Sequence, residues 1–204
     1  MDIDLSQSDL NRARNADWRR VADIAGEAFA NDPVNRYVFG KEASIRSMFR
    51  VMARNLYLPH GLCHLHPAGG STMWMPPEVT AEASSIGLLT FALGQIRHGT
   101  PGAIERGLKI SEQMQAWHPK DLHFYLFAIG TTQTARGKGV GKALLKPVLT
   151  ACDAASMPVY LENSNPDNSG FYAAHGFERM GTFQINGEGS PIMEPMWREP
   201  KLLP

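Results

Sequence analysis

The stretch ARGKGVGKALL, residues Ala135 to Leu145, follows an apolar run of strand length and leads directly into a helical pattern. It sets Gly137, Gly139 and Gly141 at alternate positions beside basic residues. A strand, a glycine-rich turn and a helix form a common phosphate site, because the first helical turn has unpaired N–H groups at the positive end of the helix dipole. Glycine lets an oxyanion approach those amides closely. The stretch therefore predicts a ligand that carries phosphate.

The spacing of the loop tests two familiar nucleotide motifs. A P-loop needs GxxxxGK followed by Ser or Thr, but Arg136 stands at the first glycine position and Ala143 follows Lys142. A dinucleotide fingerprint needs GxGxxG, whereas the third glycine here arrives one residue early. Neither nucleotide motif fits.

The loop does satisfy the pattern Arg-x-x-Gly-x-Gly through Arg136, Gly139 and Gly141. Downstream, PVYLENSNPDNSGFYAAHGF reads as a strand, then Asn165, then Tyr172 seven residues later, before Gly-Phe. Together these motifs resemble the GCN5-related N-acetyltransferase (GNAT) superfamily, most clearly from about 123 to 183. The segments FYLFAIG, GKGVGKALLKPVL, VYLENS and FYAAHGF resemble its branch of puromycin N-acetyltransferase and related small-molecule acetyltransferases.

The order strand, helix, strand, helix, strand in the C-terminal half implies a crossover and an α/β fold. The resemblance implies a single GNAT-like domain over 1–204, with a mixed, mostly antiparallel sheet splayed between two central parallel strands and helices on both faces. We expect 1–14 to be a flexible lead-in and 123–183 to be the core that binds acetyl-CoA.

Hydrophobic periodicity and turn residues predict the elements along the chain. The stretch NDPVNRY, 31–37, reads as a break between helices. The apolar run SSIGLLTFALGQI is too short for a membrane span, which needs about 20 residues, so it predicts a buried or interface helix. The expected helices are 17–29, 43–57, 81–98, 102–117, 140–152 and 166–176; the expected strands are a hairpin over 62–77 and the segments 123–132, 157–164, 177–185 and 192–198.

The resemblance implies acetyl-CoA as cosubstrate and a set of residues that bind it. Ala128, Ile129 and Thr131 would pair through their main chain with the pantetheine arm, as an added strand. Asn165 would hydrogen-bond the pantetheine amides, although capping the helix at Pro166 is an alternative role. The pyrophosphate would be held by the loop residues Arg136, Gly137, Lys138, Gly139, Val140, Gly141 and Lys142.

Tyr172 is the candidate catalytic acid. A phenol with a pKa near 10 stays protonated at neutral pH and can supply the proton that a leaving thiolate needs; a core tyrosine is the alternative. Glu162 is the best-placed carboxylate to act as base, with a structural role as its alternative, and His123 is a second candidate. A backbone N–H of Ile129 or Gly130 could polarise the carbonyl. No metal is called for.

These residues predict an acetyl-CoA-dependent N-acetyltransferase that moves an acetyl group to an amine of a small molecule by direct transfer in a ternary complex. The sequence leaves two alternatives open. One is a protein lysine or N-terminal acetyltransferase, and the other is a non-catalytic acyl-CoA-binding sensor. Which amine accepts the acetyl group cannot be inferred from the glycine loop or from Tyr172 and Glu162.

The amino-acid composition limits the kinds of binding partner and the cellular compartment that we expect for this protein. Twenty basic and twenty acidic residues cancel over 204 residues, which argues against the broad basic surface of a nucleic-acid binder. Cys63 and Cys152 lie far apart in apolar surroundings, as expected for reduced thiols. The polar N-terminus lacks the apolar core of a signal peptide. We therefore expect a cytoplasmic monomer or homodimer that binds neither nucleic acid nor membrane.

Overall fold

The computed structural model describes residues 3–77, 79 and 85–201, and in these residues eight strands form one sheet in the order β1-β2-β3-β4-β5-β8-β6, with β7 also paired to β8. Only β4 and β5 are parallel; the other pairs are antiparallel. The prediction of a mixed, mostly antiparallel sheet around two parallel strands is confirmed. The strands are β1 Asn11–Arg12, β2 Leu62–His66, β3 Gly70–Met75, β4 Phe124–Thr131, β5 Val159–Asn163, β6 Glu178–Arg179, β7 Phe183–Gln184 and β8 Ile192–Arg198.

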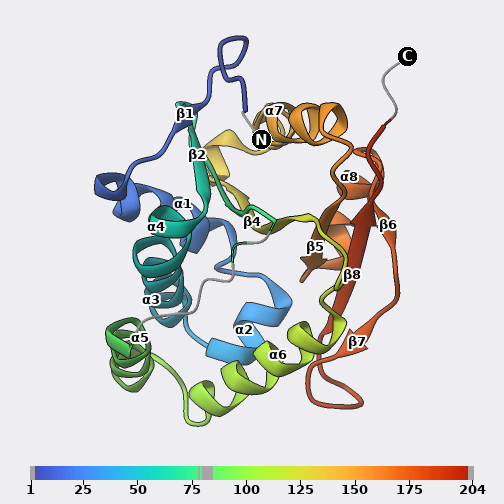
Figure 1. Ribbon diagram of the computed structural model, residues 1–204. Coiled ribbons are helices and arrows are strands. Elements are labelled where there is room, and N and C mark those ends of the chain that lie inside the picture. Colours follow the sequence, from blue (N-terminus) through green and yellow to red (C-terminus); the bar gives the residue numbers. More distant parts are fainter. Residues whose placement is uncertain (1–2, 78, 80–84, 202–204) are drawn as a thin grey trace.

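Helices cover both faces of this sheet, as predicted (Figure 1). Helices α1 and α3 lie with α2, α5 and α6 on one side, and α7 and α8 lie on the other. Short turns of 3-10 helix precede α1, α7 and α8, and a π-helical turn, Ala53–Tyr57, joins α3 to α4. The helices are α1 Trp18–Ala28, α2 Pro33–Phe39, α3 Glu42–Met52, α4 Leu58–His60, α5 Ser85–His98, α6 Ala103–Trp117, α7 Val140–Ala154 and α8 Ser169–Ala173.

The side chains of β4 alternate between two cores. Phe124 and Leu126 pack with the apolar side of α7, whereas Tyr125 and Phe127 face α1 and α3. Phe124 and Leu126 are buried, whereas Tyr125 and Phe127 are only half-buried. The reason is that they border a cavity, described below.

The two central strands separate after a short parallel ladder. Their last paired residues are Leu126 and Leu161. Beyond that point β4 continues along β3, and β5 continues along β8. A bulge between β3 and β4 accompanies the divergence, because Met73 pairs with Ala128 while Trp74 pairs with Leu126. The backbone edge of β4 after Leu126 is thus left facing a wedge between the strands.

Gly130 sets how closely α1 approaches this wedge. A Cβ at Gly130 would lie 2.6 Å from Cβ of Ala28, so any larger residue would push the end of α1 away from β4. The C-terminal end of α1 can therefore lie directly against the widening strand.

Two of the sequence predictions were wrong. The stretch 31–37 is not a break, since α2 begins within it at Pro33. The side chain of Asp32 caps this helix by accepting a 2.9 Å hydrogen bond from the Asn35 amide. A cap followed by proline at the first helical position is a helix start. The stretch 177–185 is not one strand, because β6 and β7 each pair with a different part of β8.

The apolar stretch of α5 is not a core helix. Its described part leaves Ile86, Leu89, Leu93 and Ile96 exposed; residues 81–84 of the predicted helix lie outside the described residues. Among the helices that the structure describes, none is both long and apolar enough to cross a bilayer. Cys63 and Cys152 are free thiols, and burial raises the pKa of each to about 12.

Candidate active site

The wedge between β4 and β5 opens into two cavities that meet. The first, of about 660 Å³, runs along the glycine-rich loop, and we call it the loop cavity. The second, of about 400 Å³, lies between the sheet and helices α2, α3 and α6, and we call it the apolar cavity. Four residues line both: Phe29, Ile129, Asn168 and Tyr172. The two cavities therefore adjoin at these residues, Tyr172 among them.

The loop cavity gathers most of the residues expected to bind the cosubstrate. Lys138 is exposed and does not line it, and Ala128 lines the apolar cavity instead. The expected residues found in its lining are Ile129, Thr131, Arg136, Gly137, Gly139, Val140, Gly141, Lys142, Asn165 and Tyr172.

Two glycines of the loop are needed for backbone conformation rather than for room. Gly137 and Gly139 have φ of +72° and +77°, and a Cβ at either position would meet no atom within 4 Å. Other residues rarely adopt this conformation. Gly139 is the N-cap of α7, so the turn delivers the chain to the helix with its first amides next to the cavity.

The loop is docked on the end of α1. The Arg136 guanidinium donates to the backbone carbonyl of Ala28 at 3.2 Å, and the Gln133 amide donates to Glu27 Oε1 at 2.8 Å. Arg136 remains largely exposed, so further donors of its guanidinium face solvent. A cationic fork, a helix start and a glycine turn around one cavity fit the pyrophosphate of coenzyme A.

Asn165 shows the capping role that was kept as the alternative. Its Oδ1 accepts a 3.1 Å hydrogen bond from the Asp167 amide at the start of the 3-10 turn Pro166–Asn168. Within the described part of the chain its Nδ2 has no protein partner, and the residue lines the loop cavity. Asn165 can thus cap the turn and still offer two N–H donors to a ligand.

Tyr172 has its ring in the core and its hydroxyl at the junction of the cavities. The ring packs edge-on against Phe171 and Phe177. Among the described residues no group hydrogen-bonds the hydroxyl. Burial, followed by the negative charge of Asp32, raises the pKa of Tyr172 well above 10. The phenol therefore keeps its proton at neutral pH and can donate it to a ligand.

Asp32 ties α2 to the end of β5. Its carboxylate accepts from the amide and the side chain of Asn35 and, at 2.6 Å, from the hydroxyl of Ser164. Burial raises the pKa of Asp32, while these donors lower it. Asp32 also lines the loop cavity, and its negative charge helps to raise the pKa of the Tyr172 hydroxyl.

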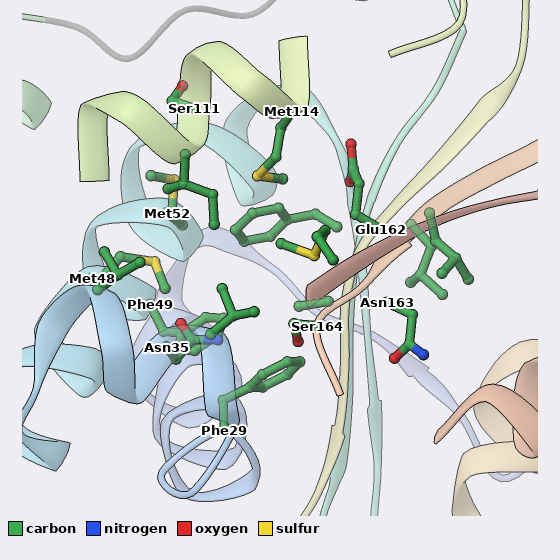
Figure 2. Close-up of a pocket in the computed structure, with 18 of the residues that line it drawn as sticks. Phe29, Asn35, Met48, Phe49, Met52, Ser111, Met114, Glu162, Asn163 and Ser164 are labelled. Atoms are coloured by element: carbon green, nitrogen blue, oxygen red, sulfur yellow. The ribbon is translucent and has the colours of Figure 1, made fainter. Parts of the chain in front are cut away.

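Glu162 is buried in the wall of the apolar cavity, with only 2% of its side chain exposed. The Tyr125 hydroxyl donates to its Oε2 at 2.7 Å. Its Oε1 has no hydrogen-bond partner among the described residues, and the nearest cationic candidate, His118 Nδ1, is 3.8 Å away. Figure 2 shows Glu162 on one wall of the cavity, with Met48 and Met52 of α3 on the opposite wall.

A pair of histidines connects Glu162 to the outside. The Nε2 atoms of His118 and His123 are 3.0 Å apart, so one of them carries the shared proton. His123 Nδ1 lies 2.7 Å from the Asp121 carbonyl. His123 itself lines neither cavity, and His118 stands between it and the apolar cavity. Glu162, His118 and His123 thus lie in a row, with a hydrogen bond between the two histidines and a gap of 3.8 Å between His118 and Glu162.

The rest of the apolar cavity is lined mostly by hydrophobic side chains, but polar side chains also line it (Figure 2): Asn35, Ser111, Gln115, His118, Asn163, Ser164 and Asn168. Within the described lining, Glu162 is the only carboxylate, and there is no lysine or arginine. The large apolar and aromatic members are Phe29, Phe39, Met48, Phe49, Met52, Tyr57, Phe91, Met114, Tyr125, Phe127 and Met193.

The sequence pointed to Glu162 but not to Tyr125 or His118. Alternation along the strands was a usable signal, because parallel pairing of Tyr125 with Tyr160 puts Tyr125 on the same face as Glu162. His118 follows α6, and nothing local in the sequence indicates that α6 ends beside β5.

Comparison with known proteins agrees with this geometry. Residues 112–194 match the family model described as acetyltransferase (GNAT) domain. An uncharacterized N-acetyltransferase of Schizosaccharomyces pombe is 24% identical over 205 residues, which cover 93% of this chain and 83% of the relative.

Two solved structures share the fold over nearly the whole chain. One is described as histone acetyltransferase HPA2 and related acetyltransferase, from Corynebacterium glutamicum; its TM-score is 0.67 at 23% identity, covering 95% of this chain and 97% of that one. The other, assigned as arylalkylamine N-acetyltransferase 7 of the mosquito Aedes aegypti, has a TM-score of 0.61 at 10% identity, covering 94% and 87%.

Proposed function

We propose that this chain is an acetyltransferase of the GNAT type that moves an acetyl group from acetyl-CoA to an amine of a small molecule by direct transfer in a ternary complex. The match of residues 112–194 to the GNAT acetyltransferase model supports the acetyl transfer. The observation that carries the proposal is the junction of two cavities at Tyr172. One cavity suits a phosphate-bearing ligand, and the other suits an apolar one.

In this proposal the loop cavity binds the cosubstrate, which supplies the activated acetyl group as a thioester. Arg136 and the amides from Gly137 to Lys142 hold its pyrophosphate, with Lys138 contributing only through its backbone. The open edge of β4 at Ala128, Ile129 and Thr131 pairs with its pantetheine arm. The free Nδ2 of Asn165 donates to the same arm.

Two different side chains near the junction carry out the two proton transfers of the reaction. The Tyr172 hydroxyl holds a proton that it can release to the departing sulfur. Glu162 accepts the proton that the acceptor amine must lose, and His118 and His123 carry it outward. A backbone N–H of Ile129 or Gly130 polarises the carbonyl that is attacked.

The small-molecule acceptor is supported by the resemblance to the puromycin N-acetyltransferase branch and by the apolar lining of the second cavity. The names of the structural neighbours cover both kinds of acceptor, since one is a histone acetyltransferase and another acts, by its name, on arylalkylamines. We further propose a cytoplasmic monomer or homodimer that binds neither nucleic acid nor membrane.

Two measurements test the proposal. Titration with coenzyme A, ATP and NAD should show tight binding of coenzyme A alone. Release of free thiol from acetyl-CoA should then depend on an added small amine. Coenzyme A binding without transfer to any amine would favour a sensor, and transfer to a peptide but to no small amine would favour a protein acetyltransferase.

A further inference from the structure

Resting on the proposed function, we infer that the acceptor is a small amine with a single positive charge and an apolar body, whose ammonium group binds the carboxylate of Glu162. The site is the apolar cavity of about 400 Å³. This volume lies in the range that small-molecule ligands occupy in proteins.

Glu162 supplies the recognition of charge. Its Oε1 is buried and forms no hydrogen bond within distance and angle limits among the described residues, although buried polar atoms are nearly always hydrogen-bonded; the hydroxyl of Tyr160, which also forms none, is the protein group that interacts with Glu162 besides Tyr125 and His118. An ammonium group carries up to three donors and a compensating charge. One such group in the cavity would satisfy this oxygen.

Tyr125 fixes the direction of that carboxylate. Its hydroxyl donates to Oε2 at 2.7 Å. Burial, and next the negative charge of Glu162, raise the pKa of Tyr125 well above 10, so the phenol stays a donor. With Oε2 occupied, Oε1 is the oxygen left for a ligand.

The side chains that line the apolar cavity indicate what the rest of the acceptor molecule, apart from its ammonium group, should be like. Aromatic rings and methionines from β4, α2, α3 and α6 face one another across the cavity. Such side chains pack well against aromatic or branched aliphatic groups of irregular shape.

The same lining rejects other amines. A second ammonium inside the apolar cavity would find no second carboxylate in its described lining, and a buried unpaired charge is strongly unfavourable. A carboxylate on the acceptor would find no lysine or arginine and would be repelled by Glu162. Polyamines and amino acids should therefore be poor acceptors.

Matched pairs of amines test this inference. Hexylamine and 1,6-diaminohexane share a chain and differ by one charge; 2-phenylethylamine and phenylalanine share a ring and differ by one carboxylate. We expect kcat/KM to be about 100-fold higher for the first member of each pair. Equal or better transfer to the diamine or the amino acid would overturn the inference.

A charge-removing variant tests the role of Glu162. Glu162→Gln keeps the shape of the side chain, and calorimetry should show hexylamine binding at least about tenfold more weakly in the presence of coenzyme A. Glu112→Gln, an exposed change on α6, is the matched control and should bind hexylamine as the wild type does. Unchanged binding by Glu162→Gln would contradict the inference.

The two readouts separate this inference from the proposed function. If hexylamine binds and the diamine does not, yet no amine is acetylated, the proposed function fails and the assignment of the cavity stands. If the diamine or phenylalanine is the best acceptor, the proposed function stands and the inference fails.

Discussion

The hydroxyl of Tyr125 on β4 donates a 2.7 Å hydrogen bond to Oε2 of Glu162 on β5, across the point where the two parallel strands separate. The bond therefore spans the top of the wedge that holds both cavities. It orients the buried carboxylate of Glu162, a residue that lines the apolar cavity. Two adjacent strands thus supply the candidate general base, Glu162, and the hydroxyl of Tyr125 that orients it.

Tyr125→Phe should weaken catalysis while leaving the ring in place. Without its donor, the carboxylate of Glu162 loses the hydrogen bond that orients it. We expect kcat/KM for the amine to fall about tenfold at pH 7. Steady-state kinetics between pH 5 and 9 would measure this.

The control for that variant is Tyr37→Phe. Tyr37 lines neither cavity, and its hydroxyl accepts only a 3.2 Å bond from Asn186 among the described residues. Its kcat/KM for the amine should match the wild type. An unchanged kcat/KM in Tyr125→Phe would mean that the bond to Glu162 has no part in the chemistry.

The parts of the site that could be predicted from sequence are local in the chain. Gly137, Gly139 and the helix that follows them form one short segment, so their spacing carries the geometry. Asn165 and Tyr172 are likewise placed by one strand and one short turn of helix. These residues meet the loop at a single cavity, as the resemblance implied.

The apolar cavity could not be predicted, because its walls come from segments far apart in the sequence. Met52, Met114 and Phe127 become neighbours only when α3 and α6 fold over β4. Each of these residues, taken alone, reads as ordinary core. Helix α2 was missed because 31–37 is rich in turn-forming residues, although Asp32 and Pro33 are also a helix-start signal.

Gly139→Ala should damage cosubstrate binding through the backbone. The residue has φ of +77°, which costs a residue with a side chain about 1 kcal/mol, so the loop should relax away from its present shape. We expect coenzyme A to bind about tenfold more weakly. Calorimetric titration would measure the change.

Gly170→Ala is the matched control for the loop. Gly170 lies in α8, has no positive φ, and a Cβ there would meet nothing within 4 Å. Coenzyme A affinity should be unchanged and the melting temperature equal or slightly higher. If Gly139→Ala bound coenzyme A as tightly as this control does, the loop would not be the pyrophosphate site.

Asp153 and Arg198 hold α8 in place behind Tyr172. The guanidinium makes two bonds of 2.7 and 2.8 Å to the carboxylate, and its Nε donates to the His175 carbonyl at the end of α8. Only 3% of the Arg198 side chain is exposed. Asp153→Asn would leave a buried charge unpaired, and we expect unfolding free energy to fall by about 3 kcal/mol at pH 7.

The pH dependence gives a second check on this pair. Burial opposes ionisation of Asp153, but its bonds from Arg198 and the Lys201 amide outweigh burial and lower its pKa below 3.8. The stabilisation should be complete above pH 3.8 and be lost as the pH falls through the native pKa. Urea unfolding of wild type and variant at pH 7, 4 and 3 would show the difference shrinking.

Asp23→Asn provides the comparison for Asp153. Asp23 pairs with Arg50 at 2.9 Å, but 41% of its side chain is exposed. The loss of stability should stay below about 1 kcal/mol. An equal fall in unfolding free energy in the two variants would show that the buried pair of Asp153 and Arg198 stabilises the fold no more than an exposed pair does.

Tyr172 also makes a prediction about pH. Because its pKa is raised above 10, the proton that it supplies is not lost in the neutral range. Activity should therefore reach a plateau and show no alkaline decline from Tyr172 up to about pH 10. A decline centred between pH 7 and 9 that disappears in Tyr172→Phe would contradict this assignment.

The most direct test of the account is the rate of thiol release from acetyl-CoA with hexylamine, compared between the wild type and Tyr172→Phe. We predict amine-dependent release by the wild type, and a kcat about 100-fold lower in the variant with coenzyme A affinity within about threefold. Equal kcat values, or no release by the wild type with any amine, would contradict the proposal that Tyr172 serves an acetyl transfer at the junction of the two cavities.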